Sequence, residues 1–239
     1  KRFFQIQIEP FDSTLFFAHL IIPVARRKYY PPLSKSQISL SSTIFHARKG
    51  FDEFLRALKR YNVEQGVFVD SKDNNIPREA IVLYMTVNPM DEMRAYNLLQ
   101  KTMNERLYDM ALHSSTPPFN VYKEYKSTLH QSPVSKYIKY DVDSKEVEHI
   151  DALRDLARKN NITFHLVVET KNGYHVVLSN ETSFEKSKQG GDARKAMSDF
   201  VEKNNSWIQK NEPGAQIVIP GTYQGGFLAK IIDDWNIKK

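Results

Sequence analysis

Cysteine is absent from this chain of 239 residues, which excludes disulfide bridges, zinc ribbons and thiol nucleophiles. Long apolar runs are also missing. The run at residues 15–24 is too short to span a bilayer and is interrupted by His19 and Pro23. No signal peptide precedes it, so we expect a cytoplasmic protein with no membrane association. Internal repeats and low-complexity tracts are not evident.

What is present indicates an ordinary globular protein. Hydrophobic residues make up 41% of the chain and aromatic residues 12%. This length can bury the core of one large domain or of two small modules. The net charge of +6 is compatible with a polyanionic partner such as nucleic acid. Because the chain begins with Lys1 and ends with Lys239, we expect it to be part of a longer protein with further domains.

The first half predicts an α/β module over residues 1–132, followed by a second module over residues 133–239. The expected elements of the first module are strands at 1–10, 37–45 and 80–87 and helices at 51–61 and 91–113. Residues 117–135 are expected to connect the modules. The basic and aromatic loop at residues 26–32 has two interpretations: a single-strand binder, or a solvated loop whose tyrosines cap the core. We favour the second.

The second half predicts the order β-α-β-β-α-β. The expected strands are 137–143, 163–169, 174–178 and 215–219, and the expected helices are 145–159 and 192–204. This is the ferredoxin-like or RNA-recognition-motif (RRM-like) topology, whose first and third strands are neighbours in the middle of the sheet. The fold class is therefore α+β. A hairpin with close backbone approach is expected at residues 218–227, where glycines cluster.

Asp141 and Asp143 lie one residue apart on the first of these strands, so their side chains point to the same face. Two such carboxylates can hold hard divalent cations, as two-metal phosphoryl-transfer sites require. The same spacing also occurs where a strand ends at the protein surface, and the spacing alone does not separate the two cases.

The turn before the strand at 174–178 carries Lys171, Asn172 and Gly173, and His175 follows. A cation, backbone amides and an imidazole could converge there on a triphosphate. Taken alone, His175 is equally compatible with a core histidine hydrogen-bonded to the backbone. Its expected place beside Asp141 and Asp143 favours the ligand-binding interpretation.

These residues resemble the motifs of the archaeo-eukaryotic primase superfamily, the primase-polymerases. Residues 138–143 match its hydrophobic run followed by Asp-hydrophobic-Asp. Lys171, Gly173 and His175 match its second motif, with Gly where Ser is usual. Residues 219–222 resemble its Arg-hydrophobic-Pro-Gly-Ser/Thr element, with Val218 where Arg is common.

Two positions of the family pattern are matched less well. Lys230 is the expected substitute for the missing arginine. The third carboxylate normally precedes the Pro-Gly element, where Glu212 is the near candidate. We expect Asp233 to serve instead, with Asp234 as its competitor, since adjacent residues on a strand face opposite ways.

The resemblance covers essentially the whole chain, because residues 83–89 are also similar to the N-terminal module of small bacterial primase-polymerases, and among these the CRISPR-associated ones are the most similar. It implies template-directed DNA synthesis of the kind used in DNA replication, from nucleoside triphosphates on single-stranded DNA, including synthesis that starts without a primer. It also implies two Mg²⁺ or Mn²⁺ ions held by Asp141, Asp143 and Asp233, with Lys171, Asn172, Gly173, His175 and Lys230 on the nucleotide.

Two other functions remain open at this point. The first is an RRM-like module that binds single strands without catalysis, by stacking bases on Tyr137 and Tyr174. The second is a two-metal nuclease or cyclase on the same fold.

Overall fold

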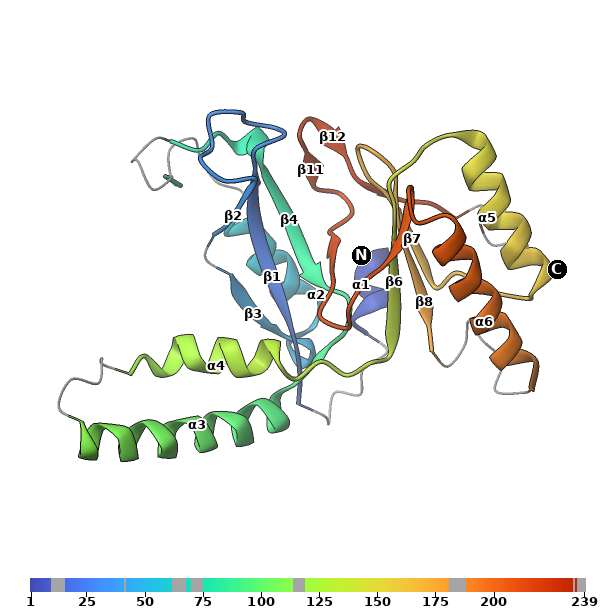
Figure 1. Cartoon of the computed structure of the whole chain (residues 1–239). Coiled ribbons are helices and arrows are strands. Elements are labelled where there is room, and N and C mark those ends of the chain that lie inside the picture. Colours follow the sequence, from blue (N-terminus) through green and yellow to red (C-terminus); the bar gives the residue numbers. More distant parts are fainter. Residues whose placement is uncertain are drawn as a thin grey trace.

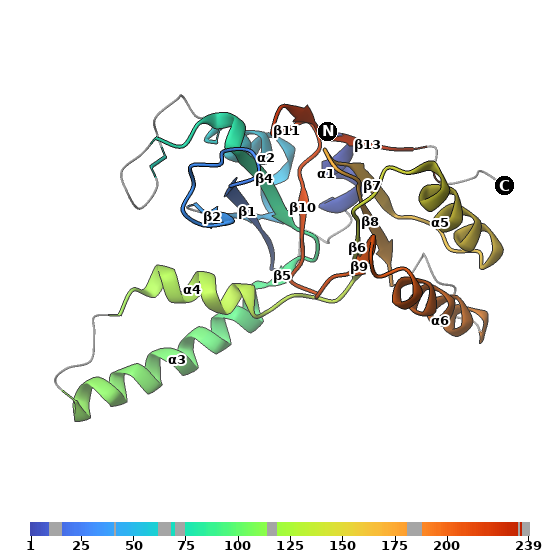
Figure 2. The same cartoon turned by 45° about the horizontal axis from the view of Figure 1, so that its top comes forward.

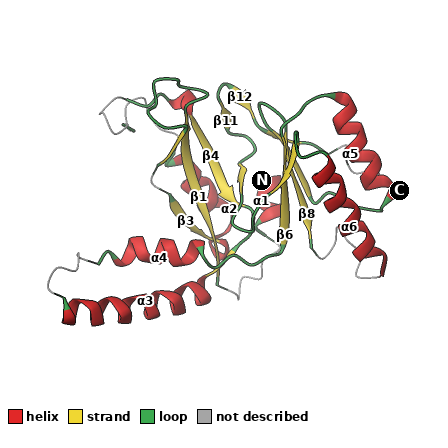
Figure 3. Ribbon diagram, in the orientation of Figure 1, coloured by secondary structure: helices red, strands yellow, loops and turns green. Residues whose placement is uncertain are grey.

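A computed structural model describes residues 1–9, 16–40, 42–61, 68–69, 75–113, 119–180, 188–233 and 235, and it shows an α+β protein built around two antiparallel sheets (Figures 1 and 3). The two sheets stand side by side, with the N-terminal helix between them at one end (Figures 1 and 2). None of the helices in the described ranges is both long and apolar enough to cross a membrane.

The first sheet has the strand order β10-β4-β1-β2, and β3 and β5 also pair with β1. Its strands are β1 (Phe17–Arg26), β2 (Gln37–Ser39), β3 (Thr43–His46), β4 (Ile81–Thr86), β5 (Met90–Asp91) and β10 (Gln216–Val218). Its central strands β1 and β4 are almost wholly buried, as expected for apolar runs covered on both faces.

The second sheet has the order β13-β7-β8-β6-β9. Its strands are β6 (Tyr137–Val142), β7 (Leu166–Glu169), β8 (Tyr174–Ser179), β9 (Ile208–Lys210) and β13 (Lys230–Ile231). The strands β6 and β8 are neighbours in the middle, as expected from the sequence. A separate hairpin joins β11 (Tyr223–Gln224) to β12 (Phe227–Leu228), and its two turn glycines have positive φ, as a tight hairpin turn requires.

The longer helices have recognisable sequence signals. They are α2 (Gly50–Lys59), α3 (Glu92–Leu112), α4 (Val121–His130), α5 (Val147–Lys159) and α6 (Lys188–Lys203). Asp91 caps α3 by accepting a hydrogen bond from the Arg94 amide, and Asn120 caps α4 in the same way. The helices α3 and α4 form a pair that extends away from the sheets, whereas α5 and α6 cover the outer face of the second sheet (Figures 1 and 2). Two single turns of 3-10 helix lie at Ala47–Lys49 and Arg78–Ala80.

Three expectations about secondary structure are wrong. The N-terminal segment is a helix, α1 (Arg2–Gln7), and not a strand, because a helix buries both Phe3 and Phe4 whereas a strand would turn them to opposite faces. The expected single strand at 37–45 is two strands, β2 and β3. The expected connection at 117–135 contains α4, whose Thr128 and Leu129 are buried.

The fourth strand of the second sheet was also assigned wrongly. It is β9, whereas the predicted strand at 215–219 forms β10 and pairs with β4 of the first sheet. The turn at Pro213 and Gly214 separates β9 from β10 and redirects the chain. The chain therefore passes from the second sheet back to the first beyond the expected boundary at residues 132 and 133.

The two faces of the second sheet bury different side chains. Even-numbered residues of β6, such as Tyr140 and Val142, pack under α5 and α6. Tyr137 and residues of β7 and β8 instead share a core with α1 and the first sheet. Odd-numbered residues of β6 therefore face the space between the two sheets.

His19, on β1, is fully buried, and burial lowers its pKa to about 4, although a hydrogen bond to the Thr86 carbonyl opposes the shift. Below pH 6.5 His19 is protonated in the unfolded chain but stays neutral in the folded protein. Falling pH therefore favours unfolding. Between pH 6.5 and 4 this costs up to about 3 kcal/mol of unfolding free energy. His19→Asn keeps a donor for Thr86 and should flatten the pH dependence of urea unfolding by that amount. An unchanged slope would contradict the assignment.

Candidate active site

The strand β6 presents Lys139, Asp141 and then Asp143 to the space between the sheets. Lys139 is buried, Asp141 is partly buried, and Asp143, just past the strand, is exposed. Both carboxylates lie close enough to Lys139 that their charges favour its protonated form. The structure therefore brings Asp141 and Asp143 together on one face.

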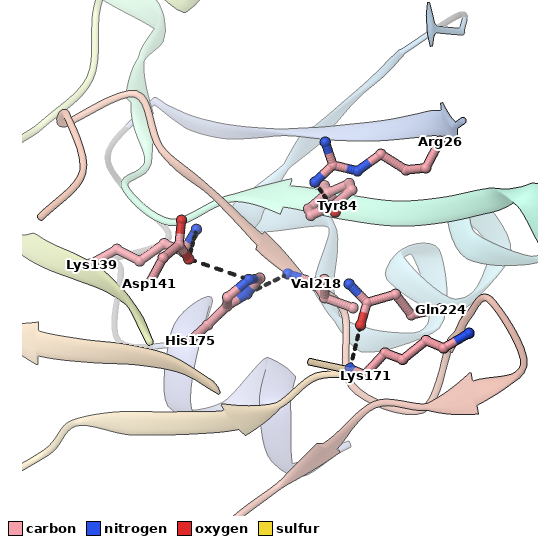
Figure 4. A network of polar contacts seen from close by, with 8 residues as sticks. All are labelled: Arg26, Tyr84, Lys139, Asp141, Lys171, His175, Val218 and Gln224. Carbon is pink, nitrogen blue, oxygen red and sulfur yellow. Dashed lines mark hydrogen bonds and ion pairs between the residues drawn. The ribbon is translucent and has the colours of Figure 1, made fainter. Parts of the chain in front are cut away.

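His175 lies directly across from Asp141, in register on β8. Its Nδ1 accepts a hydrogen bond from the Val218 amide at 3.2 Å, so its proton belongs on Nε2, which lies 3.4 Å from Asp141 Oδ1 (Figure 4). Burial, together with the positive charges of Lys139, Arg26 and Lys28, holds the pKa of His175 well below its ordinary value. The ring is thus neutral at physiological pH and can donate one hydrogen bond.

Asp141 forms an ion pair with Lys139, with 2.7 Å between Oδ1 and Nζ. Oδ1 is buried, and the contact with this oxygen opposes the lowering of the Lys139 pKa by burial. Such an oxygen retains capacity for a further ligand.

Two cations near the carboxylates, Arg26 at the end of β1 and Lys28 after it, belong to residues 26–32, which we expected to form a solvated loop. The Arg26 guanidinium donates to the Tyr84 hydroxyl at 3.0 Å, within the first sheet. The Lys28 ammonium lies 5.2 Å from the centre of the Tyr29 ring, and the charge of Asp143 reaches Lys28. Three basic residues followed by two tyrosines were the available signal, and only the fold shows which face this segment covers.

The turn between β7 and β8 is held against the β11–β12 hairpin. The Lys171 amide donates to the Gln224 side chain and its ammonium to the Gly225 carbonyl, both at 2.7 Å. The Lys171 ammonium also lies 5.0 Å from the centre of the Tyr29 ring, which Lys28 contacts as well. We call these two lysines the cationic rim of the site. Asn172 is exposed beside it.

Gly173 is buried against the end of β6. A Cβ at this position would lie 1.8 Å from the Val142 carbonyl oxygen and 3.0 Å from the Ser144 amide. This close approach explains why glycine occupies the position. The turn therefore fixes the backbone on either side of Asp143.

Gly173→Ala should destabilise the protein by about 3 kcal/mol, because the new methyl group forces β6 away from the turn. Urea denaturation followed by circular dichroism measures this loss. The matched control is Gly191→Ala in α6, where a Cβ meets nothing within 4 Å. Because alanine favours a helix, the control should be neutral or stabilising. Equal effects of the two substitutions would contradict the close packing.

A groove of about 520 Å³ adjoins Lys139. It is lined by Val24, Arg26, Gln37, Ser39, Tyr84, Lys139, Asn211, Glu212, Gly214, Ala215 and Gln216. Lys139 thus contacts both the groove and Asp141. Among the described residues lining the groove, Glu212 is the one carboxylate.

Asp233 and Lys230, by contrast, lie at the far edge of the second sheet. Asp233 pairs with Arg2, and the Lys230 ammonium lies 3.1 Å from Glu169. Two strands, β7 and β8, separate β13 from β6, which corresponds to about 14 Å at the usual strand spacing. The structure therefore does not bring Asp233 or Lys230 to Asp141, and Asp234 lies outside the described residues.

Comparison of the chain with protein-family models, curated proteins and solved structures gives no match. The site's chemistry must therefore be argued from its own residues. Within the ranges described above, no set of three or more His, Asp or Glu side chains is arranged to hold a metal ion. Asp141 and Asp143 nevertheless fit a hard cation in part, since Asp141 offers a buried oxygen and phosphate or water oxygens can complete the coordination.

The two tyrosines proposed for base stacking do not share an open face. Tyr137 is 3% exposed and stacks on His165 in the core between the sheets. Tyr174 packs against Trp235 with the residues under α5 and α6. This removes the observation on which the RRM-like stacking alternative depended.

Proposed function

We propose that this protein is a primase-polymerase that joins nucleoside triphosphates on a single-stranded DNA template. The observation that carries the proposal is the face shared by Asp141, Asp143 and His175 on adjacent central strands, with basic side chains around it. The strand order β9-β6-β8-β7, in the chain order β-α-β-β-α-β, supports an RRM-like catalytic module of the archaeo-eukaryotic primase type.

In this proposal Asp141 and Asp143 hold Mg²⁺ or Mn²⁺, which supplies charge stabilisation at the reacting phosphate. The neutral His175 donates its Nε2 proton to a phosphate oxygen of the incoming nucleotide. Lys28 and Lys171 supply positive charge at the rim, and Arg26 takes the place of the arginine that Val218 does not provide. The Val218 amide holds the His175 ring in the orientation that this requires.

Template-dependent incorporation of a labelled nucleotide, with and without a primer and in Mg²⁺ or Mn²⁺, tests the proposal. Products longer than the primer identify a polymerase, and products made without a primer identify a primase. Shortened primers would indicate a two-metal nuclease on the same site. Absence of any divalent-dependent product on a bound template would reject the proposal.

His175→Ala should raise the apparent KM for the nucleotide about tenfold, because one hydrogen bond to a charged phosphate is lost. Steady-state incorporation at varied nucleotide concentration gives this value. His130→Ala, at the exposed end of α4, is the control and should leave KM unchanged. An unaltered nucleotide KM in His175→Ala would mean that His175 does not bind the phosphates of the nucleotide.

A further inference from the structure

Lys139 is an unusual residue for the middle of a sheet, because its side chain is only 6% exposed. Lysine is rarely buried without a partner, since removing an ammonium from water is costly. Burial accordingly lowers the pKa of Lys139, and the charges of Asp141 and Asp143 oppose the shift. The side chain is tolerated here because Asp141 compensates its charge.

The Lys139 ammonium occupies one of the positions that a divalent cation on Asp141 would use. Its Nζ is 2.7 Å from Oδ1, which is buried. A divalent ion and an ammonium at the same oxygen would repel each other strongly at this distance. The two cations therefore compete for Asp141.

The adjoining groove provides a place for the displaced ammonium. Lys139 and Arg26 both line it, so an anion bound there would meet two positive side chains. The Arg26 guanidinium also donates to the Tyr84 hydroxyl, and Tyr84 lines the same groove. An ammonium released from Asp141 can thus exchange one anionic partner for another.

We propose that Lys139 is a built-in counter-ion that occupies Asp141 until a divalent cation binds, and then turns into the groove to hold a phosphate of the nucleotide. This inference rests on the proposed function. It makes Lys139 a positioning residue that couples the two ligands: the metal frees the ammonium, and the freed ammonium strengthens nucleotide binding. By linkage, the nucleotide strengthens metal binding by the same factor.

The first experiment measures Mn²⁺ affinity by calorimetry on the full chain without nucleotide. Lys139→Gln should bind Mn²⁺ at least tenfold more tightly than the wild type, because the competitor is gone. Lys139→Arg keeps the charge and should remain near the wild type. Lys210→Gln, an exposed charge on the neighbouring strand β9, is the matched control and should change affinity less than twofold.

The second experiment measures binding of a fluorescent nucleoside triphosphate with EDTA and with saturating Mn²⁺. In EDTA, Lys139→Gln should match the wild type within twofold, since the wild-type ammonium is still held by Asp141. With Mn²⁺ it should bind the nucleotide at least fivefold more weakly. A merely structural role for Lys139 would weaken binding equally under both conditions.

The outcomes separate this inference from the function on which it rests. If Asp143→Asn, which leaves the Lys139–Asp141 ion pair intact, abolishes Mn²⁺ binding but Lys139→Gln leaves Mn²⁺ affinity unchanged, the counter-ion role is wrong and the metal site stands. If neither the wild type nor Lys139→Gln binds Mn²⁺, both are wrong. Circular dichroism checks folding, and Lys139→Met, which restores an apolar stem, replaces Lys139→Gln if that variant is unfolded.

Discussion

Asp143→Asn should lower nucleotide incorporation by about a thousandfold, or roughly 4 kcal/mol of transition-state stabilisation, while leaving the melting temperature unchanged. Asp143 is the sharper of the two carboxylates to test because it is exposed and its replacement leaves the Lys139–Asp141 ion pair intact. The amide retains the size of the carboxylate but not the charge that a divalent cation needs. Rates with saturating nucleotide and Mn²⁺ measure the loss.

Replacing Asp141 requires more care, because Asp141→Asn alone leaves the buried Lys139 without its partner, which is strongly destabilising. The double substitution Asp141→Asn with Lys139→Gln removes both charges together and should fold. It should be as inactive as Asp143→Asn. The matched control is Asp151→Asn with Asp155→Asn on the outer helix α5, which should remain fully active. If Asp143→Asn incorporated nucleotide at the wild-type rate, Asp143 would have no role in the reaction.

Asp233→Ala in the same assay addresses the third carboxylate. The resemblance assigned Asp233 to the metals, whereas the structure pairs it with Arg2 at the far edge of the sheet. We therefore expect little loss of incorporation from this variant. A loss comparable to that of Asp143→Asn would restore the assignment and require that the C-terminal segment move toward β6.

The geometry of the carboxylate face could be predicted from the sequence, because it depends on side-chain alternation along a strand and on the order of the secondary-structure elements. Alternation on β6 places Asp141 and Asp143 on one side, and the β-α-β-β-α-β order makes β6 and β8 neighbours, which brings His175 opposite Asp141. The same alternation includes Lys139, two residues earlier. A lysine on a central strand, two residues before Asp141, is the sequence signal that would have placed Lys139 in the site.

The rest of the site depends on contacts between distant segments. Arg26 and Lys28 approach the carboxylates from a loop more than a hundred residues away, and no periodicity in that loop reveals which face it covers. The sequence around β10 also does not show that this strand joins the first sheet, since a short apolar strand pairs equally well with an edge of either sheet. The position of the 26–32 segment and the pairing of β10 both depend on burial of the core that the two sheets share, and not on strand propensity.

Asn88 should be among the most sensitive positions of the protein, because it joins the two sheets through its side chain. It is 1% exposed and follows β4 closely. Its Nδ2 donates to the Tyr137 and Pro213 carbonyls, both at 2.9 Å. Its Oδ1 accepts from the amides of Lys136 and Tyr137 at 3.0 and 2.7 Å. One amide side chain thus holds the start of β6 and the β9–β10 connection against the first sheet.

Asn88→Ala should lower the free energy of unfolding by about 4 kcal/mol, since it leaves several buried backbone groups unpaired, each at a cost of roughly 1–3 kcal/mol. Urea denaturation followed by circular dichroism gives the value. The control is Asn204→Ala, whose side chain donates to the Phe200 carbonyl at the end of α6 and whose loss should cost about 1 kcal/mol. Equal losses would mean that other contacts hold the sheets together. Because Lys139 follows this junction by two residues and Arg26 lies on the opposite sheet, a folded Asn88→Ala protein should also lose nucleotide affinity.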